Sequence, residues 1–500
     1  MSSLDVRRLN SIPKRQIYRS MRKLLQGQVL HLFRMVVSLA LLPLDTSIFF
    51  VAAAVAYFLP SFLQLETLHR QEILRDVQFR PKTVLITGLD TPHGLRVARC
   101  WYNEGHRVVG ADITDTRFAS GESMSRALVG YYRIPKAQYA SRLLDIVLRE
   151  KVDIWIPCAQ DASAVDDALA KQAIEGRTGC KCVTLDTELA IQWSRSETFV
   201  QYLTKQDLPV VENYQVQSRD SIHRILHRSP TKVYHIRKTA PAVNVEGAIV
   251  LPKRTLSSTY SKVSEIQISK DNPWLMQQHA RLGELLAELL IINGYVNAIA
   301  IRPASQESAW GSSPLNEGLA AAIHQVMNSF ASRGGPRVTG HLILRLMVDK
   351  QLTSNSVRYD VHIAGCTQGA AAIAHLLQNT HSQSLVNGYL AILSEDGISN
   401  TSMDVFTRPK ASITRIPSRL PSVYKTIKSW DVRKVLPALY PVAQRIDWAV
   451  DEAGKLLMFW KNWRFSFTDP LPWWWHTHVS WPLREVELVL HSKRIHASQM

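Results

Sequence analysis

The sequence predicts an α/β domain followed by an α+β domain, between an N-terminal part with an apolar segment (residues 1–80) and a tryptophan-rich C-terminal tail (401–500). Over residues 81–190, short apolar runs alternate with helical patterns, which is typical of a parallel sheet covered by helices. Over residues 191–400, helices mix with longer strands, which indicates α+β structure. These strands are expected at 231–237, 263–268, 295–301, 341–348 and 357–363.

Composition narrows the classes of function. The 500 residues are 46% hydrophobic and 20% charged, which excludes wholesale disorder and collagen-like repeats. A net charge of +17 points to an anionic partner such as a nucleotide, a nucleic acid or a membrane surface. A nucleic acid is not expected, because the basic excess is not interleaved with aromatic residues. Five cysteines are too few for a disulfide scaffold and favour a reducing compartment.

The apolar segment spans residues 35–65, and its only charged residue is Asp45. A membrane-spanning helix needs about 20 residues, so this run is too long for one comfortable span and too short for two. Pro43 breaks helices and Asp45 favours a turn. We therefore expect a membrane hairpin of two short helices, 29–44 and 48–63, that dips into one leaflet.

The charges on both sides of this segment predict its orientation. Residues 1–28 carry seven basic residues and one acidic residue, and four basic residues follow the segment before residue 83. Positive charge on both flanks favours both ends facing the cytosol. We expect membrane lipid as a partner and a membrane-associated protein whose catalytic part faces the cytosol. A single span near 42–64, a cleaved signal peptide and a pair of buried core helices are the alternatives.

A glycine-containing turn follows the first expected strand, Thr83–Thr87. Gly88 and Gly94 flank the turn, but the dinucleotide fingerprint G-x-G-x-x-G has a middle glycine that this turn lacks. Asp112, after the strand expected at 107–111, is placed for a ribose hydroxyl. An NAD(P)-dependent oxidoreductase is therefore one alternative function.

Other short motifs indicate no chemistry. Tyr132 and Lys136 match the Y-x-x-x-K pair of short-chain dehydrogenases, but Pro135 argues against the helix that this pair needs. Cys180 and Cys182 are too close together for a zinc site and have no second pair nearby. The chain contains no H-E-x-x-H, G-x-S-x-G or G-x-x-x-x-G-K-[ST] motif.

Two basic or aromatic regions are candidate interaction surfaces. Residues 219–262 carry nine Lys and Arg against two acidic residues, and a cation on a strand offers a fixed charge to phosphate oxygens. A solvated basic face is the alternative. The tail holds eight of the 13 tryptophans, which lie on a bilayer interface or pack back on the core or the N-terminal segment. These are Trp430, Trp448, Trp460, Trp463, Trp473, Trp474, Trp475 and Trp481.

The order of elements from Lys82 to Cys366 resembles the ATP-grasp superfamily, and within it carbamoyl-phosphate-synthase-like proteins. The motifs TVLITG, GHRVVGAD, YYRIP and DIWIP are similar to the Rossmann-like pre-ATP-grasp domain of that family. The motif LPVV is similar to the strand with which the family's ATP-grasp domain begins. The family's strand with a phosphate-binding lysine is similar to VYHIRK, and its hinge to NPWLMQQHARLGE. Its two metal-holding strands are similar to TGHLILRLMVD and YDVHIAGCTQGAA. The tail DPLPWWWHTHVSWPLR and the apolar N-terminus are similar to membrane-associated fungal members.

The resemblance implies a two-lobed ATP-grasp domain with ATP as its cofactor. Arg237 or Lys238 would bind phosphate, Gln277 and Gln278 would border the adenine, and Glu284 matches the glutamate of the family's Gly-Glu pair. The implied reaction joins a carboxylate to an amine through an acyl phosphate and releases ADP. Its substrates would be a small-molecule carboxylate and an amine, in specialised metabolism.

Four positions depart from the family pattern. Arg345 stands where family members place a carboxylate in the first metal strand, and His362 and Ala364 stand in the corresponding part of the second. Ser196 replaces the first nucleotide-binding lysine. Because Mg²⁺ prefers carboxylate oxygens, these residues predict no protein ligand for Mg²⁺ at the expected positions. The alternative function is a catalytically degenerate scaffold that keeps the fold.

Overall fold

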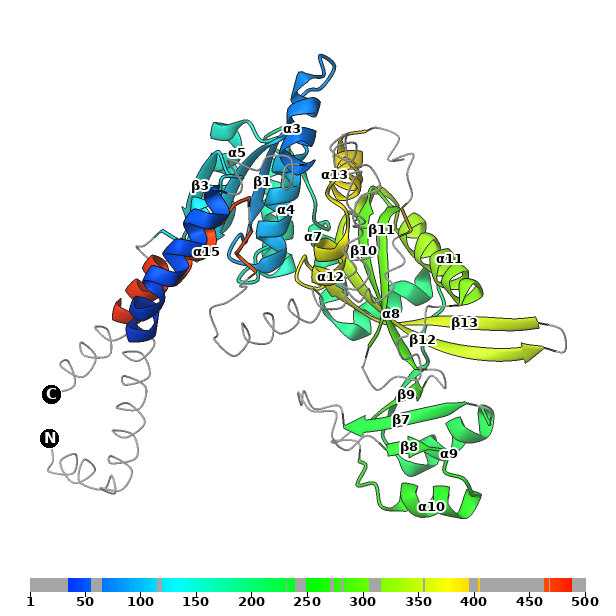
Figure 1. Cartoon of the computed structure of the whole chain (residues 1–500). Helices are drawn as coiled ribbons and strands as arrows, with labels where there is room; N and C mark the ends of the chain where they lie inside the picture. Colours follow the sequence, from blue (N-terminus) through cyan, green and yellow to red (C-terminus); the bar gives the residue numbers. More distant parts are fainter. Residues whose placement is uncertain are drawn as a thin grey trace, which may run out of the picture. The chain divides into compact units, whose positions relative to one another are not determined.

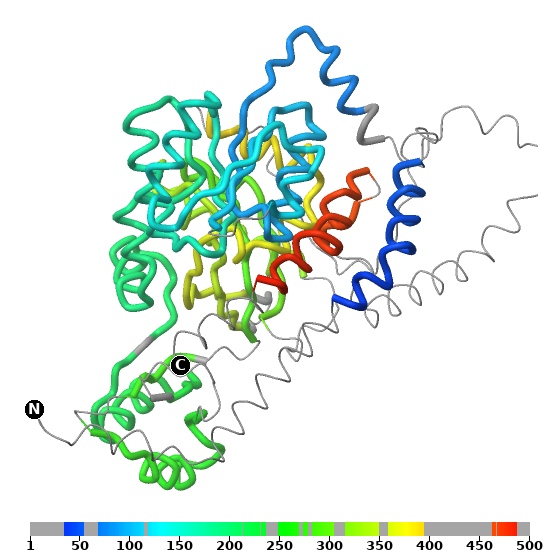
Figure 2. Tube along the Cα trace, turned by 90° about the vertical axis from the view of Figure 1, so that its left-hand side faces the viewer, coloured from blue at the N-terminus to red at the C-terminus, as the bar shows by residue number. Residues whose placement is uncertain are grey.

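The computed structural model of the protein, drawn along the chain in Figures 1 and 2, divides into two compact units. The first unit combines Met1–Pro81, Gly105–Arg133 and Arg415–Met500, and the second combines Lys82–Glu104 and Ile134–Thr414. The structure describes residues 35–54, 65–114, 119–230, 232–238, 249–269, 274–279, 283–304, 316–353, 356–394, 403–404, 463–466 and 468–487.

The first sheet contains β1 (Thr83–Thr87), β2 (Arg107–Ile113), β3 (Gly130–Ile134), β4 (Ile154–Pro157) and β5 (Lys181–Cys182). Its order is β3-β2-β1-β4-β5, and β1, β4 and β5 are parallel neighbours. The residues of β1 and β4 are almost all buried, because helices cover both faces of such a sheet. The alternating helices are α4 (Pro92–Asn103), α5 (Tyr139–Glu150) and α6 (Ala164–Glu175). The expected α/β pattern with a parallel sheet is confirmed.

The second sheet contains β10 (Glu284–Ile292), β11 (Tyr295–Pro303), β12 (Gly340–Thr353), β13 (Ser356–Gln368) and β14 (Met403–Asp404). Its order is β13-β12-β10-β11-β14; the first four strands in this order are antiparallel to one another, and β14 is parallel to β11. The strands expected at 295–301, 341–348 and 357–363 are therefore confirmed.

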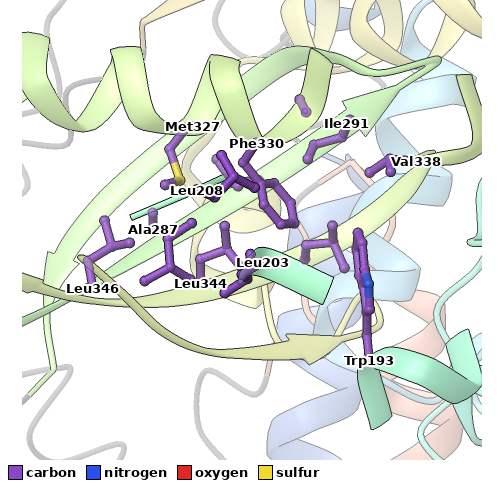
Figure 3. Close-up of a cluster of buried hydrophobic side chains, with 14 of the residues drawn as sticks. Trp193, Leu203, Leu208, Ala287, Ile291, Met327, Phe330, Val338, Leu344 and Leu346 are labelled. Atoms are coloured by element: carbon purple, nitrogen blue, oxygen red, sulfur yellow. The ribbon is translucent and has the colours of Figure 1, made fainter. Parts of the chain in front are cut away.

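One face of the second sheet forms the largest hydrophobic cluster, under the helices α7 (Thr187–Ser194), α8 (Ser196–Lys205) and α11 (Glu317–Gly334). The ring of Trp193 packs against Phe199 and Phe330, with ring centroids 5.8 Å and 5.3 Å apart. Figure 3 shows Phe330 pointing from α11 toward the sheet. Burial of such large rings contributes roughly 2 kcal/mol each and fixes the helices on this face.

The third sheet contains β6 (Asn213–Val216), β7 (Val233–Lys238), β8 (Ile249–Leu251) and β9 (Trp274–His279). Its order is β6-β9-β7-β8, with the helices α9 (Arg219–Arg228) and α10 (Leu256–Ser264) beside it. The strand expected at 231–237 is confirmed as β7. The strand expected at 263–268 is wrong, because Thr255 and Ser258 form a capping box that starts α10, and this helix continues to Ser264.

The remaining described elements are short. They are α3 (Leu65–Arg75), α12 (Ala374–Asn379), α13 (Ser382–Leu390), α15 (Leu471–Trp475), the π-helical turn η6 (His476–Ser480) and the 3₁₀ turns η1 (Glu122–Met124), η2 (Lys136–Gln138), η3 (Gly335–Arg337) and η4 (Ala391–Leu393). Tyr132 lies in β3 and Lys136 in η2, so the Y-x-x-x-K match lies on no common helix.

The described part of the apolar segment forms one helix, Met35–Ala54, which we call the N-terminal helix. It runs through Pro43 and Asp45 without a break, so the predicted turn between helices 29–44 and 48–63 is wrong. Pro43 removes a single helical hydrogen bond, and Ser47 Oγ donates to the carbonyl of Pro43 at 2.8 Å. Among the described residues, this is the one helix long and apolar enough to cross a membrane, by length and composition.

The tryptophan-rich tail includes a second helix in the same unit. Residues 471–487 form a continuous helix through α15 and η6, which we call the C-terminal helix. Trp473 is almost fully buried and packs edge-on against Phe465, with ring centroids 5.3 Å apart. Trp474 Nε1 donates to Thr46 Oγ1 of the N-terminal helix at 3.2 Å. These two rings pack within the protein, as one of the two interpretations expects, whereas Trp430, Trp448 and Trp460 lie outside the described residues.

Candidate functional site

The second sheet carries a polar face opposite its apolar face. Side chains alternate along a strand, and residues directly opposite on neighbouring strands lie on the same face. Leu285, Ala287 and Leu289 of β10 are buried in the apolar cluster. The residues between them lie on the other face, where Glu284 is opposite Met347 and Leu286 is opposite Arg345.

The register of β12 and β13 adds further charged groups to this polar face. Arg345 is opposite Gly365, Met347 is opposite His362, and Asp349 is opposite Asp360. The structure therefore brings the predicted residues Glu284, Arg345 and His362 onto one face. It adds two carboxylates, from Asp349 and Asp360, that sequence reasoning missed. The sequence pattern that could have predicted these two aspartates is the alternation of polar and apolar residues along LILRLMVDK and YDVHI.

Gln278 joins the third sheet to this face. Its backbone N–H donates to the carbonyl of Glu212 at 2.9 Å, and its Nε2 donates to Asp349 Oδ2 at 3.3 Å. Gln278 Oε1 is buried and has no partner in the described part of the chain. The neighbouring Gln277 is half-buried and is opposite Asn213 and His235 in the third sheet. The predicted adenine-bordering pair thus lies where the two sheets meet.

A hydrogen-bond network around the Glu212 carboxylate lies at the start of β7, the predicted phosphate-binding strand. Glu212 accepts hydrogen bonds from Lys232 Nζ at 2.5 Å and from Tyr234 Oη at 2.8 Å. Partial burial raises the pKa of Glu212, but the hydrogen bonds and charge of Lys232 and Tyr234 outweigh it, so its pKa is lowered overall. Lys232 is therefore already paired. Sequence reasoning missed this network, because Glu212 lies 20 residues before its lysine.

Arg237 and Lys238 have described backbones only. Both lie in β7, where Arg237 is opposite Leu275 and Lys238 is opposite Trp274 of β9. Their predicted contact with phosphate stays a prediction.

The positions expected to hold a metal do not fit Mg²⁺. Arg345 brings a positive charge, and Ala364 is buried against Val211 and Met347. His362 Nδ1 is buried without a partner among the described residues. In the described part of the chain, no group of three or more His, Cys, Asp or Glu side chains could hold a metal ion. Ser196 is an exposed residue at the start of α8.

Another carboxylate on the polar face, that of Glu288, has structural partners. Glu288 is fully buried; its Oε1 accepts from Arg302 Nε at 2.7 Å, and its Oε2 accepts from the backbone N–H of Leu376 at 2.7 Å. Glu288 thereby holds α12 against β10. The charge in the apolar run ELLAELLII was the sequence signal for it.

The glycine turn after β1 does not present a free helix N-terminus. Thr91 Oγ1 accepts from the N–H of Gly94 at 3.0 Å and donates to the carbonyl of Gly88 at 2.6 Å. The N–H group that a pyrophosphate would need is therefore already bonded. A Cβ added to Gly88 would lie 2.3 Å from the backbone nitrogen of Ala159, so this glycine serves close packing. Asp112 is buried and accepts from Tyr131 Oη at 2.9 Å. These contacts disfavour the dinucleotide alternative.

Comparison with known proteins gives structural similarities only. No protein-family model matches the chain, and no curated protein matches it. The biotin carboxylase subunit of pyruvate carboxylase is similar with a TM-score of 0.42 and 11% identity, over 58% of this chain and 64% of that one. This chain thus spans just under two thirds of that protein.

Two further solved structures are similar to a comparable degree. An L-amino acid ligase from Bacillus licheniformis has a TM-score of 0.38 and 14% identity, over 62% of this chain and 75% of that one. A phosphoribosylglycinamide synthetase from Anaerococcus prevotii has a TM-score of 0.39 and 11% identity, over 58% of this chain and 68% of that one.

Proposed function

We propose that this protein is an ATP-grasp-like ligase that binds ATP between its second and third sheets and is held on a membrane by its N-terminal helix. The proposal is supported mainly by what the structure shows where the second and third sheets meet. There, Gln278 spans from β9 to Asp349 of β12, and two buried polar atoms, Gln278 Oε1 and His362 Nδ1, have no partner in the described residues.

Unsatisfied buried polar atoms are costly, at about 1–3 kcal/mol each, and a ligand that bonds them recovers this free energy. The edge of adenine presents both a donor amine and acceptor ring nitrogens. Gln278 Oε1 can accept from such an amine, and His362 Nδ1 can donate or accept according to its tautomer. The cations of β7 and Arg345 of β12 would then neutralise phosphate oxygens from two sides.

The chemistry of a ligase at this site follows from these groups. A substrate carboxylate oxygen would attack the γ-phosphorus of ATP, break its bond to the bridging oxygen and release ADP. The amine would then attack the acyl carbon and release inorganic phosphate. Arg345 would stabilise the charge on the phosphoryl group by a fixed positive charge. Mg²⁺ bridges phosphates in such reactions, and the described donor set does not fit it.

The missing metal ligands favour a second candidate function. A protein with Arg345, His362 and Ala364 at these positions would bind ATP and act as a scaffold without turnover. ATP binding is common to both candidates, and ADP release separates them.

The test uses the full chain in detergent micelles. Its thermal unfolding midpoint should rise with ATP, and should not rise with NADP. ADP release in the presence of Mg²⁺ and a pool of amino acids as carboxylates and amines supports the ligase. A midpoint shift that is independent of Mg²⁺, without ADP release, supports the scaffold. A shift with NADP alone would overturn both.

A matched pair of variants locates the site. Gln278→Leu should abolish most of the ATP-dependent shift, because it removes the acceptor atom at the sheet junction. Lys262→Leu should leave the shift unchanged, because this lysine lies on the exposed side of α10 and pairs with Glu265. Equal loss in both variants would place ATP elsewhere.

A further inference from the structure

The N-terminal helix is buried along one narrow stripe. Ser38, Asp45 and Ala52 are its buried residues, at 2%, 3% and 1% exposure. They are seven residues apart, so they lie in a line along one side of the helix. Two of these three residues are polar, which is unusual for the buried side of a helix.

The opposite side of the same helix is exposed and mostly apolar; it also carries Ser47, whose Oγ donates to the carbonyl of Pro43. The large residues exposed there by more than half are Val36, Leu39, Leu44, Phe50 and Val51. A helix on a water-soluble protein has the reverse arrangement, with its apolar stripe toward the core. Polar groups inside and apolar groups outside suit a helix whose surroundings are lipid.

The polar stripe is bonded to the C-terminal helix. His478 Nε2 lies 2.9 Å from Asp45 Oδ2, and the two side chains are 1% and 5% exposed. Ser38 Oγ donates to the carbonyl of Thr477 at 2.9 Å and lies 3.3 Å from His478 Nδ1. Every polar group of the stripe therefore has a partner from residues at the other end of the chain.

The residues just before the C-terminal helix are in turn bonded to the segment before β3. Asp469 accepts from Ser125 Oγ at 2.6 Å and from the backbone N–H of Arg126 at 3.1 Å. Arg464 pairs with buried Glu122. The π-helical turn at 476–480 precedes Pro482, which lacks the N–H that a regular helix would use there.

We infer that the two ends of the chain build one membrane anchor, in which the C-terminal helix binds the polar stripe of the N-terminal helix and lipid covers the apolar side. This inference rests on the proposed membrane association and adds a second helix to it. Three observations favour lipid: the reversed polarity, the length of 20 residues, which matches a bilayer core of about 30 Å, and the basic residues 1–28 before it.

Thiol cross-linking in membranes of expressing cells tests the pairing. The full chain with Ser38→Cys and Thr477→Cys is treated with a short thiol-bridging reagent, and the linked peptides are identified by mass spectrometry. The control pair is Leu39→Cys with Thr477→Cys, because Leu39 points away from the stripe at 71% exposure. We expect the intramolecular link to be at least tenfold more abundant for the first pair than for the control pair. A factor of ten corresponds to a free-energy difference of about 1.4 kcal/mol between the two pairs.

A second measurement tests lipid as the occupant. Leu39→Arg with Val51→Arg should release most of the chain from carbonate-washed membranes, whereas Leu256→Arg, at a residue 68% exposed on α10, should release none. Each of these variants is compared with the unmodified chain for thermal unfolding, so that misfolded protein is recognised.

The outcomes separate the two ideas. Retention on membranes without the 38–477 link overturns the two-helix anchor and leaves membrane association standing. The link without retention overturns membrane association and lipid as the occupant. A 38–477 link between two chains would place the C-terminal helix of a second copy on the polar stripe and overturn the pairing of the two helices within one chain.

Discussion

Buried histidines show how single residues set the pH response. His341 is buried, and its Nε2 lies 2.8 Å from Tyr389 Oη. Burial, with nearby His93 adding to it, lowers the pKa of His341 from 6.5 to about 3. Between these values the unfolded chain binds a proton that the folded chain does not bind. Stability is therefore fully present above pH 6.5 and is lost as the pH falls toward 3.

We predict that His341→Gln flattens this dependence. Glutamine can bond the Tyr389 hydroxyl but does not titrate. Between pH 6.5 and 5, the unmodified chain should lose up to about 1.4 kcal/mol per pH unit more than the variant. The measurement is the midpoint of unfolding in urea, followed by tryptophan fluorescence at both pH values. His227→Gln, on the exposed side of α9, is the control and should keep the full slope.

Gly94 lies at a position where there is no room for a side chain. A Cβ added there would lie 2.1 Å from the carbonyl oxygen of Gly88, inside the turn that Thr91 holds. We predict that Gly94→Ala lowers the free energy of unfolding by about 1–3 kcal/mol, measured by thermal unfolding. Gly179→Ala is the matched control, because a Cβ there meets nothing within 4 Å. Equal stability of the two variants would contradict the packing role.

At the scale of elements, hydrophobic patterns predicted part of the strands, among them β7, β11, β12 and β13, because such patterns are local in the sequence; β10 was not among the predicted strands. The apolar side of β10 and β12 is an alternation that needs no long-range knowledge. The two failures had long-range or capping causes. Pro43 and Asp45 indicated a turn, but Asp45 bonds His478, which is 433 residues away. Residues 263–268 suggested a strand, but the capping box at Thr255 starts a helix that reaches Ser264.

The candidate site was less predictable than the elements. Glu284 and Gln278 were predicted from the resemblance, and His362 was named there as a departure at an expected metal position, whereas Asp349 and Asp360 became visible through the strand register alone. The bond from Gln278 to Asp349 joins residues 71 positions apart. Such pairs depend on which strands become neighbours, and a single sequence does not contain that information.

The helix α11 should stabilise the second sheet mainly through Phe330. This ring is fully buried and packs against Trp193 (Figure 3) and against Phe199. We predict that Phe330→Ala costs about 3–5 kcal/mol, because it leaves a cavity between α11 and the sheet. Thermal unfolding measures the loss, and Phe330→Leu should lose less. Leu256→Ala, at an exposed site, should change stability by less than about 0.5 kcal/mol.

At the scale of the whole molecule, the choice between the two proposed functions depends on whether the polar face can hold a metal. Arg345 stands opposite Leu286 and Gly365, at the centre of this face. We predict that Arg345→Glu makes ATP binding depend on Mg²⁺, with about tenfold tighter binding when the ion is present, a gain of about 1.4 kcal/mol. Titration calorimetry with and without Mg²⁺ measures this change. Arg228→Glu, on exposed α9, should leave the ratio unchanged.

The pairing of Asp45 with His478 has a consequence for biogenesis. The two residues are separated by 433 positions, and ribosomes add roughly 5–20 residues per second. The aspartate therefore waits roughly 20–90 seconds for its histidine while the rest of the polypeptide is translated. During that interval, the Asp45 side chain has no histidine partner within an otherwise apolar segment. Under the proposed membrane association, this would favour a nascent chain that stays at the bilayer surface. On the same proposal, full insertion of this helix would therefore follow the translation of His478.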